Sequence, residues 1–142
     1  MNSLPSGLPE QVADSEMLGR FCGSSSWFAR ETKRVKYPAF LPAPDDDTSV
    51  YRVTDMQAAE IWELASQHFV DATGQPHKHH GIALVRSVDV GNAKIDRVPK
   101  EPPPRHANLR GWPVADDPVL QKSRRKEAAT KIADKASFLA KS

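Results

Sequence analysis

The chain has 142 residues, of which 39 % are hydrophobic and 27 % are charged, so it suits one domain with a modest core. Its single cysteine, Cys22, excludes an internal disulfide and a zinc site built from several cysteines, and it suits a reducing cytoplasm. The N-terminus lacks the basic and apolar regions of a secretory signal, and no apolar run reaches the roughly 18 residues of a membrane helix.

Charge is distributed unevenly along the chain. The formal net charge is +2, yet residues 118–142 hold seven basic and two acidic side chains, which leaves −3 on the remainder. A mildly acidic body with a basic C-terminal segment indicates pairing with a protein partner, with another copy of the chain, or with an anionic partner such as nucleic acid. No membrane partner is expected.

The first half of the chain opens on a polar, weakly patterned leader over residues 1–19. Residues 34–41 alternate like a strand, but Pro38 confines them to a sheet edge or a loop. Residues 42–48 hold two prolines and three aspartates, which are typical of a turn.

A strand and a helix follow. Residues 49–53 are rich in β-branched and aromatic side chains and predict a strand. Residues 54–73 predict an amphipathic helix, since Thr54 and Gln57 have capping-box spacing and Gly74 supplies a stop. Its apolar stripe is formed by Met56, Ala58, Ile61, Trp62, Ala65 and Phe69.

Two more strands are expected, over residues 82–88 and 94–98. The strand–helix–strand order allows either a parallel crossover or an antiparallel arrangement with the helix across one face. Because so few strands are evident, we expect an α+β fold with a small sheet of about three to five strands and one packed helix.

The C-terminal segment predicts a basic helix over residues 118–140, which begins at an Asp117 cap with Pro118 in the first turn. Residues 122–127 include no apolar side chain, so this half should be solvated or contact a polar partner. The expected organisation is a leader (1–19), an α+β domain (20–117) and a C-terminal helix (118–142).

Residues 102–113 hold an unusual density of polar side chains between prolines and show almost no helix or strand pattern, which predicts an ordered loop. Such a loop could bind an anion or nucleotide through Arg105 and Arg110, with His106 as acid or base, and Asn108 and Trp112 as further contacts. The alternative is a structural loop in which Trp112 fills the core.

Two further features have competing interpretations. Arg52 lies in the strand over residues 49–53, where it either faces water or turns inward toward a carboxylate or ligand. His77, His79 and His80 are weak candidates for a metal site, because imidazole binds zinc, copper and nickel. No nearby cysteine completes a ligand set, so a hydrophilic loop is favoured.

The order Ser49-Val-Tyr-Arg52, Glu60-Ile-Trp62 and Pro104-Arg-His-Ala-Asn108 with Gly111-Trp-Pro113 resembles a family of small bacterial proteins to which no activity is assigned. The resemblance covers roughly residues 20–135. It implies a bacterial cytosolic protein, and it transfers no catalytic residue.

Two functions remain after these observations. The favoured one is a binding or interaction module that uses the Pro102–Pro113 loop and the basic C-terminal helix. The alternative is an enzyme acting on a nucleotide or phosphate ligand, with His106 as acid/base and with Arg105, Arg110 and Arg52 as anion clamps. Convergence of His106, Arg110 and Arg52 on one cleft would favour the enzyme. No cofactor is expected.

Overall fold

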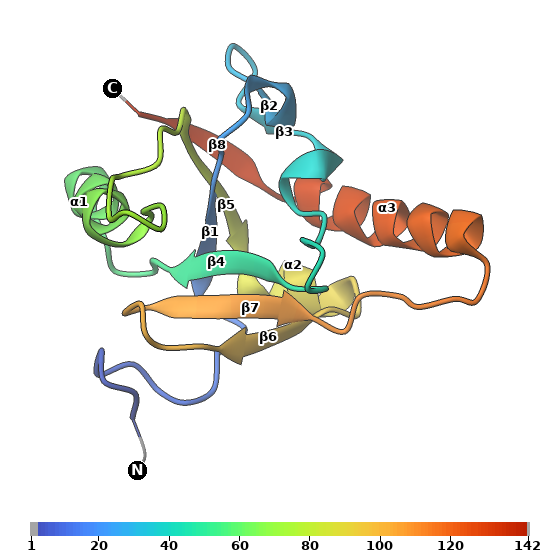
Figure 1. Ribbon diagram of the computed structural model, residues 1–142, viewed down its shortest axis with the longest axis horizontal. Coiled ribbons are helices and arrows are strands. Elements are labelled where there is room, and N and C mark those ends of the chain that lie inside the picture. Colours follow the sequence, from blue (N-terminus) through green and yellow to red (C-terminus); the bar gives the residue numbers. More distant parts are fainter. Residues whose placement is uncertain (1–2, 142) are drawn as a thin grey trace.

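The computed structural model describes residues 3–141 as one eight-stranded antiparallel sheet with three helices (Figure 1). Residues 1–2 and 142, at the ends of the expected leader and C-terminal helix, lie outside the described residues. The strands are β1 (Met17–Phe21), β2 (Phe28–Ala29), β3 (Arg34–Val35), β4 (Thr48–Arg52), β5 (Gly81–Arg86), β6 (Asp96–Pro99), β7 (His106–Arg110) and β8 (Ser137–Ala140). The helices are α1 (Ala58–His68), α2 (Ser87–Asn92) and α3 (Pro118–Asp134), with single 3-10 turns at Ser25–Trp27 and Tyr37–Ala39.

The expected size of the sheet was wrong: it has eight strands rather than three to five, although the fold is still α+β. The sequence pattern missed β2 because it has two residues, and it missed β1, β7 and β8 because polar and apolar side chains mix in them. Strand β3 begins the segment 34–41 that was expected to alternate like a strand, but it ends at Val35.

Strand order in the sheet is β2-β3-β8-β5-β1-β4-β7-β6. The central strand β1 pairs antiparallel with β4 on one side and with β5 on the other. Strands β4 and β5 therefore run parallel with β1 between them, and α1 connects them. Each expected arrangement is thus partly present. The connection from β4 to β5 is a crossover through a helix between parallel strands, but the strands that are direct neighbours in the sheet are antiparallel.

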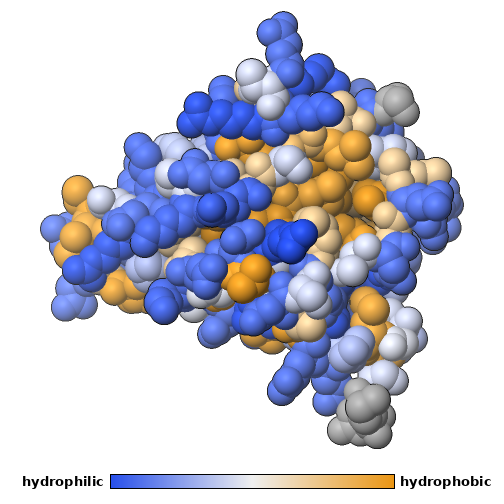
Figure 2. Space-filling view, turned by 180° about the vertical axis from the view of Figure 1, so that it is seen from behind, coloured by the Kyte–Doolittle hydropathy of each residue, from blue (hydrophilic) through white to orange (hydrophobic). Residues whose placement is uncertain are grey.

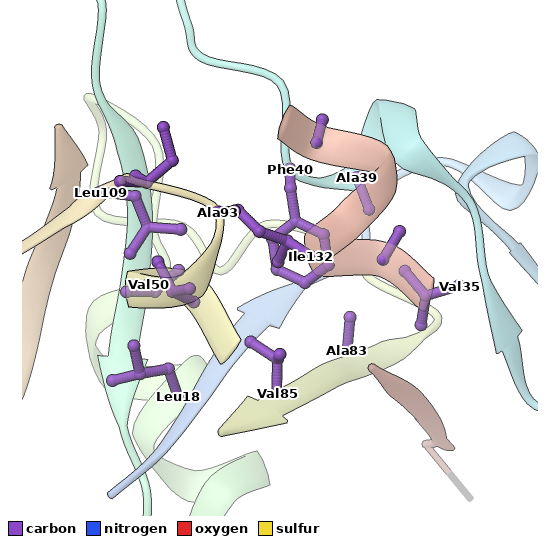
Figure 3. Packing of buried hydrophobic residues seen from close by; sticks show 14 of the residues in the cluster. Leu18, Val35, Ala39, Phe40, Val50, Ala83, Val85, Ala93, Leu109 and Ile132 are labelled. Carbon is purple, nitrogen blue, oxygen red and sulfur yellow. The ribbon is translucent and has the colours of Figure 1, made fainter. Parts of the chain in front are cut away.

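One face of the sheet carries the larger core, which lies beneath α2, α3 and the turn at Tyr37–Ala39. Its fully buried side chains include Phe40, Val50 and Ile132, which converge from three different elements (Figure 3). Alternate residues reach this core from β5 (Ala83 and Val85) and from β7 (Ala107 and Leu109), as the period of two in a strand requires. The buried stripe of α3 consists of Ala128, Ala129, Ile132 and Ala133.

The opposite face is covered in part by α1, whose Ile61, Leu64 and Ala65 pack on Phe21, Tyr51 and Ile82. Partly buried apolar side chains surround this second core, among them Met17, Trp62, Leu84 and Leu139. Viewed from behind, the molecule shows an apolar area framed by polar side chains (Figure 2). No helix within residues 3–141 is both long and apolar enough to cross a membrane.

Both expected helices differ in detail from the structure. Helix α1 is shorter than residues 54–73, and its capping box joins Gln57 and Glu60 instead of Thr54 and Gln57. The basic helix stops at Asp134, not at residue 140, and residues 137–140 form β8 against β5. Phe138 explains this change, since its ring is buried and stacks on Phe28 with centroids 3.8 Å apart. Burial of this ring outweighs the helical pattern.

A buried arginine fixes the segment that precedes β1. The Arg52 side chain, on β4, is fully buried, and its Nε and Nη2 each donate to a carboxylate oxygen of Glu16 at 2.8 Å. Its Nη1 also donates to the carbonyl oxygen of Pro9 at 2.7 Å. Arg52 thus faces inward, where a carboxylate of its own chain meets it.

Burial alone would raise the pKa of Glu16, but the hydrogen bonds from Arg52 and from the Ala13 N–H, together with the charge of Arg52, lower it below the ordinary 4.5. The carboxylate is therefore charged at neutral pH. Its contribution to stability is present above pH 4.5 and is lost as the pH falls through the lowered pKa.

Replacing Glu16 with glutamine should lower the free energy of unfolding by about 3–5 kcal/mol, because it leaves the buried guanidinium without its counter-charge. Denaturant unfolding followed by tryptophan fluorescence measures this. The exposed Glu10→Gln serves as the matched control and should change the free energy by less than about 0.5 kcal/mol. The difference in the free energy of unfolding between wild type and E16Q should become smaller below pH 4.5. A difference that stays constant in acid would contradict the role of the ion pair.

Candidate functional site

The segment 102–113, expected to be an irregular loop, contains strand β7, and this decides which way its side chains point. Residues Ala107 and Leu109 enter the larger core. By alternation, His106, Asn108 and Arg110 lie on the opposite face of the sheet, the face that α1 covers in part. Arg52 is held on the core side by Glu16. His106, Arg110 and Arg52 therefore do not converge on one cleft.

Both arginines expected to clamp an anion are engaged within the chain. Arg110 donates from Nε and Nη2 to the two carboxylate oxygens of Asp47 at 2.8 and 3.1 Å. Arg105 donates from Nη1 to Asp55 at 3.1 Å and to the Arg52 carbonyl oxygen at 2.9 Å. An incoming phosphate would have to compete with these carboxylates.

Trp112 lies in the larger core with 4 % of its surface exposed, and its indole N–H donates to the Leu109 carbonyl oxygen at 3.0 Å. This placement corresponds to the alternative in which the tryptophan fills the core. Its ring faces contact protein rather than solvent.

The histidines of the 77–80 segment pack on aromatic rings. The ring of His79 lies 5.1 Å from that of Phe21, and the ring of His80 lies 5.6 Å from that of Phe28. Burial lowers the pKa of His79, whose Nδ1 is buried without a hydrogen-bond partner. Within residues 3–141, no group of three or more His, Cys, Asp or Glu side chains has the geometry to hold a metal ion.

A contact that the sequence did not indicate joins His106 to Ser49. The Ser49 Oγ and the His106 Nε2 are 2.5 Å apart, and the His106 Nδ1 lies 2.9 Å from the Lys100 carbonyl oxygen. Because a carbonyl oxygen can only accept, Nδ1 carries the proton, and Nε2 is then free to accept from the serine hydroxyl.

The pairing of β4 with β7 creates this contact. Ser49 lies opposite Asn108, and Tyr51 lies opposite His106. The Arg52 N–H donates to the Arg105 carbonyl oxygen, so the neighbouring Arg52–Arg105 pair is hydrogen-bonded. Because the two kinds of pair alternate along an antiparallel ladder, Tyr51–His106 and Ser49–Asn108 are non-hydrogen-bonded pairs, in which side chains are closest. Alternation along a strand places Ser49 and Tyr51 on one face of β4, and His106 and Asn108 on one face of β7. This alternation was the sequence signal available for the site.

Desolvation by burial is the largest effect on the pKa of His106 and lowers it. The hydrogen bond to the Lys100 carbonyl opposes this shift, and the positive charges of Lys100 and Arg20 lower the pKa further. The ring of Tyr51 lies edge-on to the imidazole at 5.4 Å and restricts its orientation. Ser49, His106 and Asn108, hereafter the Ser–His–Asn cluster, thus combine a hydroxyl, a neutral imidazole and an amide.

A second candidate surface lies on the other side of the molecule, along the first half of α3. A groove of about 300 Å³, hereafter the α3 groove, is lined by Tyr37, Leu41, Pro42, Pro118, Gln121, Lys122, Arg125 and Lys126. The Lys126 ammonium lies 4.9 Å from the centroid of the Tyr37 ring. Arg125 is fixed by the Pro113 carbonyl oxygen at 2.8 Å and by Asp46 at 3.0 Å.

Apolar side chains are unusually exposed where α3 begins. Val114 and Val119 each expose 76 % of their surface and Leu120 exposes 42 %. Water-exposed apolar groups near exposed lysines are more typical of contact surfaces than of a solvated helix.

Comparison of the chain with family models, curated proteins and solved structures finds no match. The resemblance to a bacterial family noted in the sequence, and the bacterial origin that it implies, therefore stay predictions.

We expect NMR to find neutral His106 as the Nδ1–H tautomer, with a pKa below 6.5, because the Lys100 carbonyl accepts from Nδ1 and burial disfavours the charged ring. A long-range ¹H–¹⁵N spectrum recorded across a pH series, with His106→Gln for assignment, measures both properties. A ring protonated on Nε2, or a pKa above 6.5, would contradict the hydrogen-bond arrangement.

Proposed function

We propose that this protein is an interaction module that binds an acidic, partly apolar peptide segment of a partner protein in the α3 groove. The observation that carries the proposal is a groove in which the exposed Lys122 and Lys126 lie beside apolar lining residues. The exposed Val119 and Leu120 lie on the same half of the helix, outside the groove lining. The same half of the helix was expected from its sequence to be solvated or to contact a polar partner.

The charges of the groove favour an acidic ligand. Lys122 and Lys126 line the groove. Arg125 also lines it and is held in place by the Pro113 carbonyl oxygen and the Asp46 carboxylate. Leu41 and Pro42 give an apolar floor. A peptide with acidic side chains at its ends and apolar ones between them complements this arrangement in charge and in hydrophobicity.

A protein segment is favoured over nucleic acid because the remainder of the chain has a net charge of −3, so the basic surface does not continue across the molecule. A protein segment is also favoured over a phosphate ligand at His106, since the expected clamps Arg105 and Arg110 already have carboxylate partners. Cys22 is buried and unpaired, which suits a reducing compartment such as a bacterial cytoplasm.

Peptide display against the wild-type protein, with counter-selection on the K122E/K126E variant, should enrich acidic peptides that contain apolar residues. Fluorescence anisotropy on the enriched peptides should then show binding weakened tenfold or more in K122E/K126E, because two attractive charges become repulsive. The matched control K131E/K135E reverses Lys131, near the end of α3, and Lys135, just beyond it, both outside the groove, and should bind within about twofold of wild type.

Affinity should also fall as salt is raised. The proposal fails if no acidic peptide is enriched, or if both charge-reversal variants bind alike. It fails equally if light scattering finds a dimer that K122E/K126E dissociates, since the groove would then hold a second copy, or if an oligonucleotide binds the groove more tightly than any enriched peptide.

A further inference from the structure

The Ser–His–Asn cluster has the parts of a nucleophilic site, and nothing in the proposed binding function uses it. It lies on the face of the sheet opposite α3 and shares no residue with the α3 groove. Ser49 and His106 are both partly exposed. We propose that this cluster hydrolyses carboxylic esters through an acyl–Ser49 intermediate.

The nucleophile and its base are in hydrogen-bond contact. A serine hydroxyl is a weak nucleophile until a base takes its proton, and the His106 Nε2 lies 2.5 Å from the Ser49 Oγ. The backbone carbonyl of Lys100, 2.9 Å from Nδ1, holds the imidazole in the tautomer that leaves Nε2 free. This carbonyl takes the positioning role that a buried carboxylate has in other serine hydrolases.

Strand geometry makes the cluster rigid before any ligand arrives. Ser49 lies inside β4, between β1 and β7, and its carbonyl oxygen accepts from the Arg20 Nη1 at 3.1 Å. Tyr51 restricts the imidazole from one side as a positioning residue. Sites built on strands hold their geometry more tightly than sites built on loops.

Asn108 supplies the third function. It lies directly opposite Ser49 on the same face, in a non-hydrogen-bonded pair whose side chains approach closely. Its amide N–H can donate to the oxygen that becomes negative when the serine attacks a carbonyl carbon. We place this amide, on a residue with 8 % of its surface exposed, beside the same substrate position as the hydroxyl and the imidazole.

The reaction balances with water as its co-reactant. The Ser49 Oγ bonds to the ester carbonyl carbon while its proton moves to the His106 Nε2, and Asn108 donates to the oxyanion. The bond to the alcohol oxygen then breaks, and this oxygen takes the proton from Nε2. Water attacks the acyl–serine and gives a proton to Nε2, which returns it to the Ser49 Oγ as the carboxylic acid leaves.

The test uses the intact protein with p-nitrophenyl acetate, with release of nitrophenolate followed in time and the acetylated residue mapped by peptide mass spectrometry. Wild type should show a burst of product and one acetyl group on Ser49. Ser49→Ala should lose both, and His106→Gln should slow acylation by about 100-fold or more. Ser26→Ala, at another exposed serine, is the matched control and should behave like wild type.

The pH profile separates catalysis from a structural role. Acylation of wild type should fall as the pH drops through the lowered pKa of His106, and the residual rate of His106→Gln should lack this step. Acetylation confined to lysines, an unchanged burst in Ser49→Ala, or the same pH profile in His106→Gln would each overturn the proposal.

Ser49→Cys keeps the test decisive if the alanine variant does not fold. The imidazole should draw the proton from the new thiol, so iodoacetamide should alkylate it at mildly acidic pH at least about tenfold faster than the thiol of Ser26→Cys. The native Cys22 gives little background, because it is buried and burial raises its pKa to about 11. Equal alkylation rates would contradict the proposed base.

Discussion

Pairing of β4 with β7 in one fixed register is the constraint on which both the fold and the site depend. It directs Val50, Ala107 and Leu109 into the larger core and leaves Ser49, His106 and Asn108 together on the opposite face. A slip of one residue in either strand would reverse its set of side chains and would expose the core positions to water. Burial of the apolar set is therefore what holds the polar set in contact.

Most charged groups near this pairing have structural roles. Arg52 ties the segment before β1 to the sheet, Arg110 holds Asp47, and Arg105 joins Asp55 to the end of β4. The side chains without such a role are Ser49 and His106, which are hydrogen-bonded to each other on one face, and the lysines of the α3 groove on the other. The two proposals rest on these separate surfaces, so the failure of one leaves the other in place.

The sequence predicted elements whose signal is local and missed those whose cause lies far along the chain. The helix α1 and the strands β4 and β5 follow from periodicity, and the class α+β follows from them. The predicted stripe of α1 contains the buried Ile61 and Ala65 but also the exposed Ala58, and it omits the buried Leu64. Strand β8 was missed because residues 137–140 continue the spacing of the helix before them, and the reason for a strand is the stacking of Phe138 on Phe28.

The sequence predicted part of the site and missed the rest, because the partners of its residues lie far away along the chain. The many polar side chains around His106 indicated a site in the segment that forms β7. The Ser49 hydroxyl that contacts the imidazole is 57 residues away in the sequence. Arg52 could be predicted to need a carboxylate if it faced inward, yet nothing local identified Glu16, which is 36 residues away, as that partner. Trp112 fitted either a stacking or a core role until the packing placed it in the core.

The most direct test of this account is the cross-strand register measured in solution. Non-hydrogen-bonded antiparallel pairs bring their Hα atoms close together, so nuclear Overhauser spectra should contain strong Hα–Hα contacts between Ser49 and Asn108 and between Tyr51 and His106. Contacts displaced by one residue, such as Ser49 with Ala107, would place His106 on the other face from Ser49 and would contradict the account.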